Sequence, residues 1–226
     1  MNQEPNAQYN VAAADSLAVR VATRVRRRMF RRFLHTMSID RHKTLLDVGV
    51  TSDRSYESSN YLEAWYPYKD MITAVGVTDA SFLEGLYPGV TFVSANGCHL
   101  PFAESEFDFV HSSAVLEHVG SEENQKRFVA ELYRVARHGV CITTPNRWFP
   151  VEFHTVLPLV HWLPKRYFRC LMRNSGREFF SREENLNLLS RADLHRIVLE
   201  LGPAKAKVDS IKLWGLTSNL LLFLWK

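Results

Sequence analysis

Residues 44–49 are Thr-Leu-Leu-Asp-Val-Gly, a largely apolar run that ends in an acid and a glycine. Such a run is typical of a buried parallel strand, and the residues directly after it are able to start a helix. A strand, a tight turn and a helix N-terminus in this order place backbone N–H groups around a ligand at the carboxyl edge of a sheet. The alternative is that Gly49 only lets the chain turn, since short motifs also match by chance.

Apolar runs rich in β-branched residues alternate with helix-like stretches along the rest of the chain. The expected strands are residues 44–48, 72–77, 90–93, 107–111, 140–143, 205–213 and 216–225. The expected helical stretches are residues 15–37, 55–66, 80–87, 122–136 and 182–201. This alternation predicts βαβ units with parallel strands. The last two runs are split by Gly215 and are expected to pair as an antiparallel hairpin at the edge of the sheet.

Three polar residues at or after strand ends have side chains suited to a nucleoside cofactor. Asp79 follows the second strand, where an acid can accept hydrogen bonds from both ribose hydroxyls. Asn96 follows the third strand and carries an amide that can pair with an adenine edge. Ser112 lies at the end of the fourth. Three suitable strand ends are much harder to obtain by chance than one glycine motif, which favours a ligand site.

The chain resembles the class I S-adenosylmethionine-dependent methyltransferases, in the methyltransferase type 11 group with ubiquinone-type and many small-molecule enzymes. The resemblance is carried by LLDVGV at 45–50, by Asp79, by SANGCHLPFAESEFDFVHSSAVLEHV at 94–119 and by ELYRVARHGVCITTPN at 131–146. It implies a single domain over residues 1–226, with an α/β Rossmann-like three-layer sandwich and a mostly parallel seven-stranded sheet whose C-terminal strand is antiparallel. The implied cofactor is S-adenosyl-L-methionine. The expected cofactor-binding residues are Asp47, Gly49, Thr51, Asp53, Asp79, Asn96, Gly97 and Ser112.

The loop after residue 48 departs from the family pattern Asp-x-Gly-x-Gly-x-Gly. Only Gly49 is kept, and Thr51 and Asp53 occupy the other two glycine positions, while Asn96 replaces the usual acid. An acid at position 53 would repel a pyrophosphate, which disfavours an NAD(P)-dependent oxidoreductase. S-adenosylmethionine carries a sulfonium and an ammonium and no phosphate, so Asp47 and Asp53 suit it better. A non-catalytic protein with the methyltransferase fold is the other alternative.

Composition narrows the class of protein further. The 226 residues are 46% hydrophobic and 23% charged, as in an ordinary globular protein. No apolar stretch approaches the roughly 20 residues of a membrane span, and residues 1–10 lack the features of a secretory signal. We therefore expect a soluble, cytoplasmic protein. Cys98, Cys141 and Cys170 form no CxxC pair, which argues against disulfides and thiolate metal sites.

A basic segment precedes the first strand. Seven arginines lie between residues 20 and 32 with no acid among them, and without them the formal net charge of +4 would be negative. The apolar residues of the same segment recur every fourth position, at Leu17, Val21, Val25, Met29 and Phe33. This spacing predicts a helix over residues 15–37 that contacts anionic membrane surfaces, or one whose apolar stripe packs in the core. Nucleic acid is not an expected partner, because the chain contains no RNA-binding motif.

Residues 145–180 interrupt the pattern with four prolines and many aromatic residues. We expect this aromatic insert to form the wall of the acceptor site. Methyl transfer from a sulfonium needs alignment and a dry site, and an oxygen acceptor adds the need for a general base. The candidates are His154, Glu152 and His118, with Glu117 beside them. We expect O-methylation of a small-molecule, sugar or lipid-like acceptor, and no metal, because no histidine and carboxylate cluster has ligand spacing.

Overall fold

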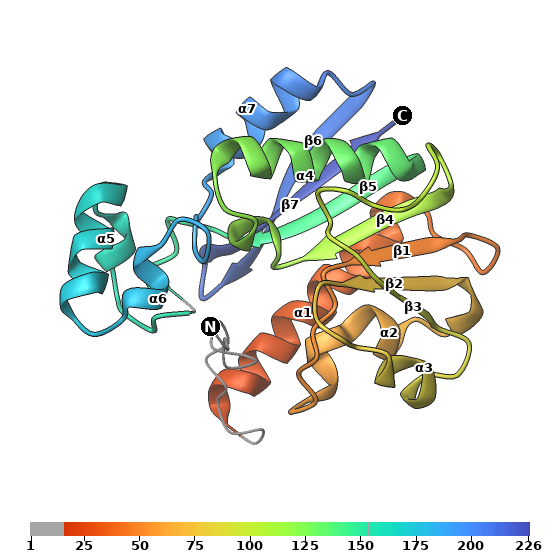
Figure 1. Cartoon of the computed structure of the whole chain (residues 1–226), viewed down its shortest axis with the longest axis horizontal. Coiled ribbons are helices and arrows are strands. Elements are labelled where there is room, and N and C mark those ends of the chain that lie inside the picture. The colour runs from red at the N-terminus through yellow and green to blue at the C-terminus, as the bar shows by residue number, and fades with distance from the viewer. Residues whose placement is uncertain (1–15, 153) are drawn as a thin grey trace.

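The computed structural model describes residues 16–152 and 154–226, which form a seven-stranded sheet between layers of helices (Figure 1). The strands are β1 (Leu45–Val48), β2 (Ile72–Gly76), β3 (Thr91–Ser94), β4 (Phe107–Ser113), β5 (Ala136–Pro145), β6 (Lys205–Leu213) and β7 (Leu216–Trp225). Their order across the sheet is β3-β2-β1-β4-β5-β7-β6. The pairs from β3 to β5 are parallel, and β7 is antiparallel to both β5 and β6. The expected sheet with an antiparallel C-terminal strand is confirmed.

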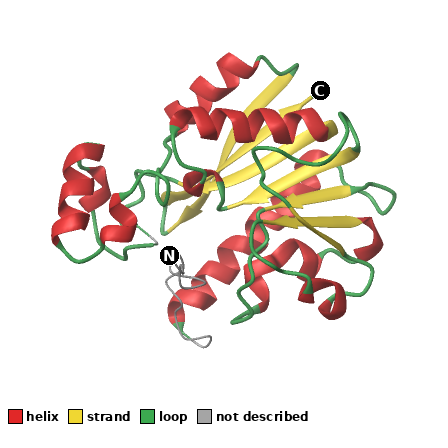
Figure 2. Ribbon diagram, in the orientation of Figure 1, coloured by secondary structure: helices red, strands yellow, loops and turns green. Residues whose placement is uncertain are grey.

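Helices cover both faces of the sheet and complete the three layers (Figure 2). One face carries α1 (Leu17–Met37), α2 (Tyr61–Trp65) and α3 (Phe82–Leu86), and the other carries α4 (Glu122–Val135) and α7 (Arg191–Leu201). The short 3-10 helices are η1 (Glu57–Asn60), η2 (Lys69–Met71), η3 (Leu116–His118) and η4 (Val160–Trp162). The aromatic insert also contains α5 (Lys165–Asn174) and α6 (Glu178–Ser181), which project beyond the carboxyl end of the sheet (Figure 1).

The side chains of β1 divide between the two cores, because successive residues of a strand face opposite sides of the sheet. Leu46 and Val48 pack with Phe128 of α4. Leu45 packs with Phe33 of α1 on the other face. All four residues of β1 are buried, which explains the nearly continuous apolar run in the sequence.

The apolar stripe of α1 is part of the core. Ser16 caps the helix by accepting from the backbone N–H of Val19, while residue 15 lies outside the described residues. Five residues of α1 are buried, and four of them, Val25, Met29, Phe33 and Met37, belong to the core on this face of the sheet. For residues 25–37, the alternative prediction, that the apolar stripe packs in the core, is therefore the correct one. This part of the stripe cannot insert into a lipid surface. Among the described helices, none is long and apolar enough to cross a membrane.

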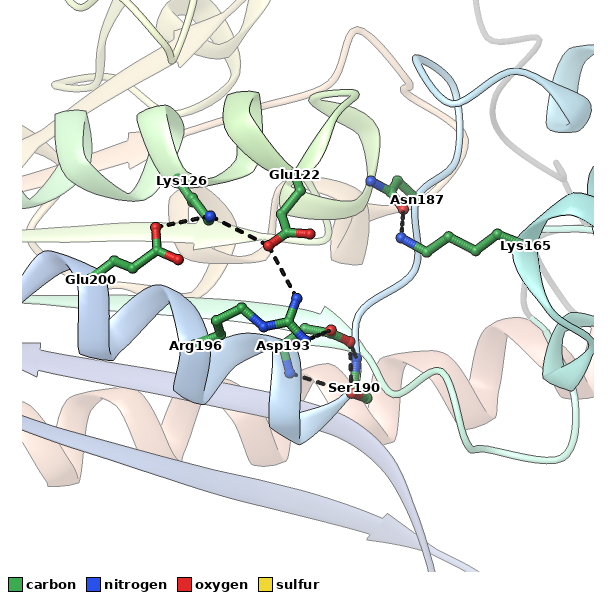
Figure 3. A network of polar contacts seen from close by, with 8 residues as sticks. All are labelled: Glu122, Lys126, Lys165, Asn187, Ser190, Asp193, Arg196 and Glu200. Atoms are coloured by element: carbon green, nitrogen blue, oxygen red, sulfur yellow. Dashed lines mark hydrogen bonds and ion pairs between the residues drawn. The ribbon is translucent and has the colours of Figure 1, made fainter.

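Ion pairs tie α7 to α4 on the outer face of the sandwich (Figure 3). Lys126 lies between Glu122 and Glu200, with N–O distances of 3.4 and 2.9 Å. Arg196 lies 3.1 Å from Glu122 and also pairs with Asp193. These side chains are largely exposed to solvent, so each pair stabilises the fold only slightly.

The predicted helix over residues 182–201 is wrong in its first half. The helix begins at Arg191, because Ser190 and Asp193 form a capping box that satisfies the first backbone N–H groups. The preceding segment is irregular and forms hydrogen bonds elsewhere. Asn187 donates its backbone N–H to Glu117 O and its side chain to Gly120 O, which ties this segment to η3.

Candidate functional site

A cavity of about 560 Å³ opens at the carboxyl ends of the parallel strands. Its walls come from residues 48–50, 75–78, 95–99, 114–115 and 118–119, which follow or end β1, β2, β3 and β4, together with residues of α4, α6 and the segment after it. In an open α/β sheet this edge is where ligands bind, and the volume is ordinary for a small-molecule site. Two hollows of similar size, about 670 and 640 Å³, lie along α1 and beside α3, away from these strand ends.

Three of the expected cofactor-binding residues line this cavity. They are Gly49, Asn96 and Gly97. Gly49 has a φ of +105°, and a Cβ atom there would collide with Val115. A Cβ atom at Gly97 would collide with the ring of Phe128. Neither position has room for a side chain, so the backbone of both glycines lines the cavity directly.

Four other expected cofactor-binding residues do not line the cavity. They are Asp47, Thr51, Asp53 and Ser112, and all are buried. Thr51 donates its backbone N–H to Asn60 Oδ1, Asp53 accepts from Ser59 Oγ and Ser55 N, and Ser112 donates to Val48 O. Direct contact of these four side chains with the cofactor stays a prediction. Thr51 and Asp53 form hydrogen bonds within the loop that replaces the glycine-rich turn.

Asp79 does not line the cavity either. Its side chain is exposed and accepts a hydrogen bond from Ser81 N, in the turn before α3. Thr78 lines the cavity in its place, since the chain after β2 turns one residue earlier than the motif suggested. The hydroxyl of Thr78 is therefore the better candidate for a contact with a ribose.

A buried pair of acids lies on the α1 face of β1. Asp47 Oδ1 lies 2.7 Å from His111 Nδ1, and His111 Nε2 lies 2.9 Å from the hydroxyl of Tyr61. Glu63 is fully buried, and neither of its oxygens has a hydrogen-bond partner among the described residues. Burial and the nearby charge of Asp47 raise the pKa of Glu63 well above its usual value. The fold therefore favours the protonated form of Glu63.

We expect Glu63→Gln to remove a pH-dependent loss of stability. The unfolded chain releases the Glu63 proton at a lower pH than the folded chain, so the free energy of unfolding of the parent falls as the pH rises above the ordinary pKa of 4.5. Glutamine has no such proton, and the variant should gain on the parent by up to about 1.4 kcal/mol per pH unit in this range. Urea unfolding of both proteins from about pH 5 to about pH 8 measures the difference. Parallel curves would contradict a raised pKa at Glu63.

The proposed catalytic residues meet at the boundary between the cavity and the aromatic insert. His118 Nε2 lies 3.0 Å from His154 Nε2, and His154 Nδ1 lies 2.6 Å from Glu152 Oε1. On its other side, His118 Nδ1 lies 2.6 Å from the carbonyl of Asn185. Of the three candidate bases, only His118 lines the cavity, and His154 and Glu152 lie behind it. We call Glu117, His118, Glu152 and His154 the histidine–glutamate cluster.

Burial and mutual contacts set the charges of this cluster. Burial lowers the pKa of His118 to about 4, and the neighbouring His154 lowers it too. Burial also opposes charge on Glu152 and His154, but their hydrogen bond outweighs it, so the pKa of Glu152 falls to about 2 and that of His154 rises. Burial raises the pKa of Glu117 to about 7. Glu152 is therefore anionic and His118 neutral, and the hydrogen bond with Glu152 favours the protonated form of His154.

The expectation that the chain holds no histidine and carboxylate cluster of ligand spacing is corrected. One ligand atom each from Glu117, His118 and His154 lies within 4.8 Å of the others. The first two residues are in η3 and the third is 36 positions later in the aromatic insert, so no local spacing could reveal the group. The aromatic insert, which is the expected acceptor wall, therefore contacts η3 through His154.

Sequence reasoning gave no role to several polar residues that line the cavity. They are His99, Asn124, Arg127, Glu184 and Asn185. Arg127 and Asn124 lie on α4. In the sequence, their positions are typical of the solvent-facing side of a helix. Glu184 and Asn185 belong to the irregular segment that was predicted to be helical. No sequence signal marked these positions as part of a site.

Comparisons with known proteins agree with this fold. A family model described as "Methyltransferase domain" matches residues 67–143, about a third of the chain. A search of curated proteins found no match. Three solved structures with similar folds show 13–17% sequence identity. The first is a SAM-dependent methyltransferase from Methanosarcina mazei, with TM-score 0.54, 17% identity, and coverage of 86% of this chain and 96% of that chain.

The other two structures hold S-adenosylhomocysteine. Magnesium protoporphyrin IX methyltransferase from Synechocystis has TM-score 0.54 and 13% identity, and the match covers 92% of this chain and 85% of that chain. The 1,6-didemethyltoxoflavin-N1-methyltransferase of Burkholderia thailandensis has TM-score 0.57 and 14% identity, with coverage of 95% and 83%. The fold is that of the class I S-adenosylmethionine-dependent methyltransferases. With the family match over residues 67–143, the resemblance expected from the sequence is confirmed.

Proposed function

We propose that the cavity at the strand ends binds S-adenosyl-L-methionine and that the chain transfers its methyl group to a small-molecule, sugar or lipid-like acceptor, with oxygen as the acceptor atom. The observation that carries this proposal is the position of the cavity, which is lined by Gly49, Thr78 and Asn96 from three successive strand ends. Two proteins of similar fold hold S-adenosylhomocysteine, which supports the choice of cofactor.

The loop after Gly49 supports a cofactor without phosphate. A dinucleotide needs its pyrophosphate at the N-terminus of a helix that directly follows the glycine turn. Here the chain continues as an irregular loop, and the next regular turns are η1 from Glu57 and the short α2. Asp53, buried in that loop, would add a negative charge near such a phosphate. These features disfavour an NAD(P)-dependent oxidoreductase.

The chemistry of the proposed transfer is an in-line displacement at the methyl carbon. The sulfonium is already an activated leaving group, so alignment and exclusion of water are the main tasks of the protein. The methyl carbon leaves sulfur and bonds to the acceptor oxygen, whose proton must go to a base. His118, at the cavity wall, is our candidate for that contact, and the paired Nε2 atoms of His118 and His154 can hold the proton between them. Glu152 then positions His154 and balances its charge.

Titration calorimetry is the test of this proposal. We expect saturable binding of S-adenosylmethionine and S-adenosylhomocysteine and none of NAD, because the cavity offers no phosphate-binding helix end. Thr78→Ala should weaken S-adenosylhomocysteine binding by about 1–2 kcal/mol, while Asp79→Ala, a neighbouring exposed position, serves as the control. Binding of NAD alone would identify an oxidoreductase. Binding of no cofactor would leave the non-catalytic alternative.

We also propose cytoplasmic location with contact to anionic membrane surfaces, now through the arginine face of α1 and not through its apolar stripe. Arg20, Arg24, Arg27 and Arg31 line the hollow of about 670 Å³ together with Trp65. Guanidinium groups bind phosphate well, and each basic group near an anionic surface contributes about 1 kcal/mol.

Vesicle sedimentation tests this contact. The full chain should pellet with vesicles that contain phosphatidylserine and not with neutral ones, and the binding should weaken with salt, because exposed charges are screened over about 10 Å at 0.1 M. Deletion of α1 is unsuitable as a control, since the helix is part of the core. A variant with Arg20, Arg24, Arg27 and Arg31 changed to glutamine keeps the fold and should stay in solution. Equal sedimentation of both proteins would exclude the arginine face.

A further inference from the structure

We propose that the histidine–glutamate cluster binds one divalent transition-metal ion of the Zn²⁺ class, through Glu117, His118 Nε2 and His154 Nε2. One ligand atom from each of these residues lies within 4.8 Å of the other two. Two imidazoles and one carboxylate suit zinc, iron or cobalt, whereas magnesium and calcium prefer oxygen ligands alone. The binding of the metal does not depend on the proposed methyl transfer.

The orientation of both imidazole rings is that of metal ligands. The Nδ1 atom of His118 lies 2.6 Å from the carbonyl of Asn185, and the Nδ1 atom of His154 lies 2.6 Å from a carboxylate oxygen of Glu152. Metal-binding histidines typically donate their second N–H to a carbonyl or a carboxylate in this way. Both Nε2 atoms are then directed toward one shared point.

The distance between the two Nε2 atoms is close to that between two ligands of one metal ion. Metal–nitrogen bonds of about 2.1 Å in tetrahedral geometry place the nitrogens about 3.4 Å apart, and a small outward rotation of the rings from the observed 3.0 Å between His118 and His154 reaches that distance. A proton shared between the rings gives a similar distance, so the third residue of the group decides between the two interpretations.

Glu117 has a buried carboxylate oxygen without a partner among the described residues, and one of its two oxygens lies within 4.8 Å of the ligand atoms of both histidines. Its Oε2 atom accepts a hydrogen bond from Thr144 Oγ1 at 2.9 Å. Its Oε1 atom is buried and has no hydrogen-bond partner among the described residues. A shared proton between His118 and His154 leaves that oxygen unsatisfied, while a metal ion bound to both rings gives it a ligand role. Buried polar atoms are rarely left without a partner in folded proteins.

Hydrogen bonds from surrounding residues hold the proposed metal ligands in place. The backbone of Asn187 donates to Glu117 O, which holds η3 in place, and Glu152 accepts from the backbone N–H groups of His154 and Thr155. Three protein ligands leave a coordination position open, and His118 borders the cavity. A site with three protein ligands and an open position is typical of catalytic zinc, which lowers the pKa of a bound water or hydroxyl. A bound metal ion would occupy both Nε2 atoms, so in the metal-bound protein an acceptor oxygen at the open position, and not the pair of imidazoles, would be the activated group.

The experiment is a metal titration of the untagged full chain after dialysis against a chelator. We expect the wild-type protein to bind one equivalent of Zn²⁺ by calorimetry, and one of Co²⁺ by its visible absorption, with no competition from Mg²⁺. His118→Ala, His154→Ala and Glu117→Gln should each weaken Zn²⁺ binding by at least about 100-fold, and Glu152→Gln by about 10-fold. His138→Ala is the matched control, because that histidine is half-exposed and pairs with Asp108 away from the cluster.

Two results would overturn the proposal: no saturable uptake of Zn²⁺ or Co²⁺ by the metal-free wild type, or equal binding by all the variants. Thermal unfolding checks that each variant folds, and the isosteric Glu117→Gln and Glu152→Gln decide the matter if a histidine variant does not. Titration of the same metal-free protein with S-adenosylhomocysteine tests the proposed cofactor separately. A failure of one proposal is therefore distinguishable from a failure of the other.

Discussion

Replacement of Gly49 by alanine is expected to weaken cofactor binding and to destabilise the fold. Gly49 has a φ of +105°, a conformation that residues with a Cβ atom rarely adopt, and the added methyl group would collide with Val115. Backbone strain of this kind costs about 1–3 kcal/mol, and overpacking against a fixed neighbour adds a similar amount. Val115 also lines the cavity, so any relief of the collision changes the shape of the cofactor site.

Calorimetry and thermal unfolding measure the two effects in the same protein. We expect the affinity for S-adenosylhomocysteine to fall at least about 10-fold, which corresponds to about 1.4 kcal/mol, and the Tm to fall by at least about 5 °C. Gly85→Ala is the matched control, since a Cβ atom there meets no atom within 4 Å and alanine favours the helix α3. Unchanged binding in the Gly49 variant would place the cofactor elsewhere.

The fold could be predicted because its signals are local. Four consecutive buried residues in β1 produce a run of apolar character, and β2, β4, β5 and β7 repeat that signal. The hairpin of β6 and β7 follows from two apolar runs around Gly215. The helix over 182–190 was wrong because Asn185 and Asn187 use their backbone groups to hold His118 and Glu117. The periodicity of apolar residues along the sequence does not predict such tertiary hydrogen bonds.

The cofactor residues could be predicted only in part. Gly49 and Gly97 are visible in the sequence as glycines next to strand ends, and both line the cavity. An acidic side chain at a strand end can bind a ligand or form a hydrogen bond with another residue of the protein. The sequence pattern does not distinguish these two roles. Asp47 bonds to His111 across the sheet, and Asp53 bonds within its own loop. Both satisfy their charge inside the protein, which is why neither reaches the cavity.

The histidine–glutamate cluster could be predicted only as a set of separate candidates. His118 and His154 were identified as residues that can transfer protons, but their contact joins η3 to the aromatic insert. Such a contact depends on how the insert folds back over the sheet, and only the tertiary structure provides it. The same contact makes His154 a positioning residue and gives His118 the place at the cavity wall.

Replacement of His154 by alanine is expected to lower turnover by about 100-fold or more, the usual cost of losing a general base or its partner. His118 would lose the group that shares a proton or a metal ion with it, and Glu152 would keep a buried charge without its partner. Cofactor affinity should stay within about twofold, because His154 does not line the cavity. The measurement follows methyl transfer from labelled S-adenosylmethionine into the cell-extract fraction that contains the acceptor.

The matched control is His161→Ala. His161 is buried in the same insert and bonds to the carbonyl of Phe149, outside the histidine–glutamate cluster. Its loss should loosen the insert about as much as the loss of His154, while turnover is retained. Glu152→Gln keeps an acceptor for His154 Nδ1 without the charge, so an intermediate loss of about 10-fold is expected. If His154→Ala and His161→Ala lower turnover equally, the effect comes from the stability of the insert, and His154 has only a packing role.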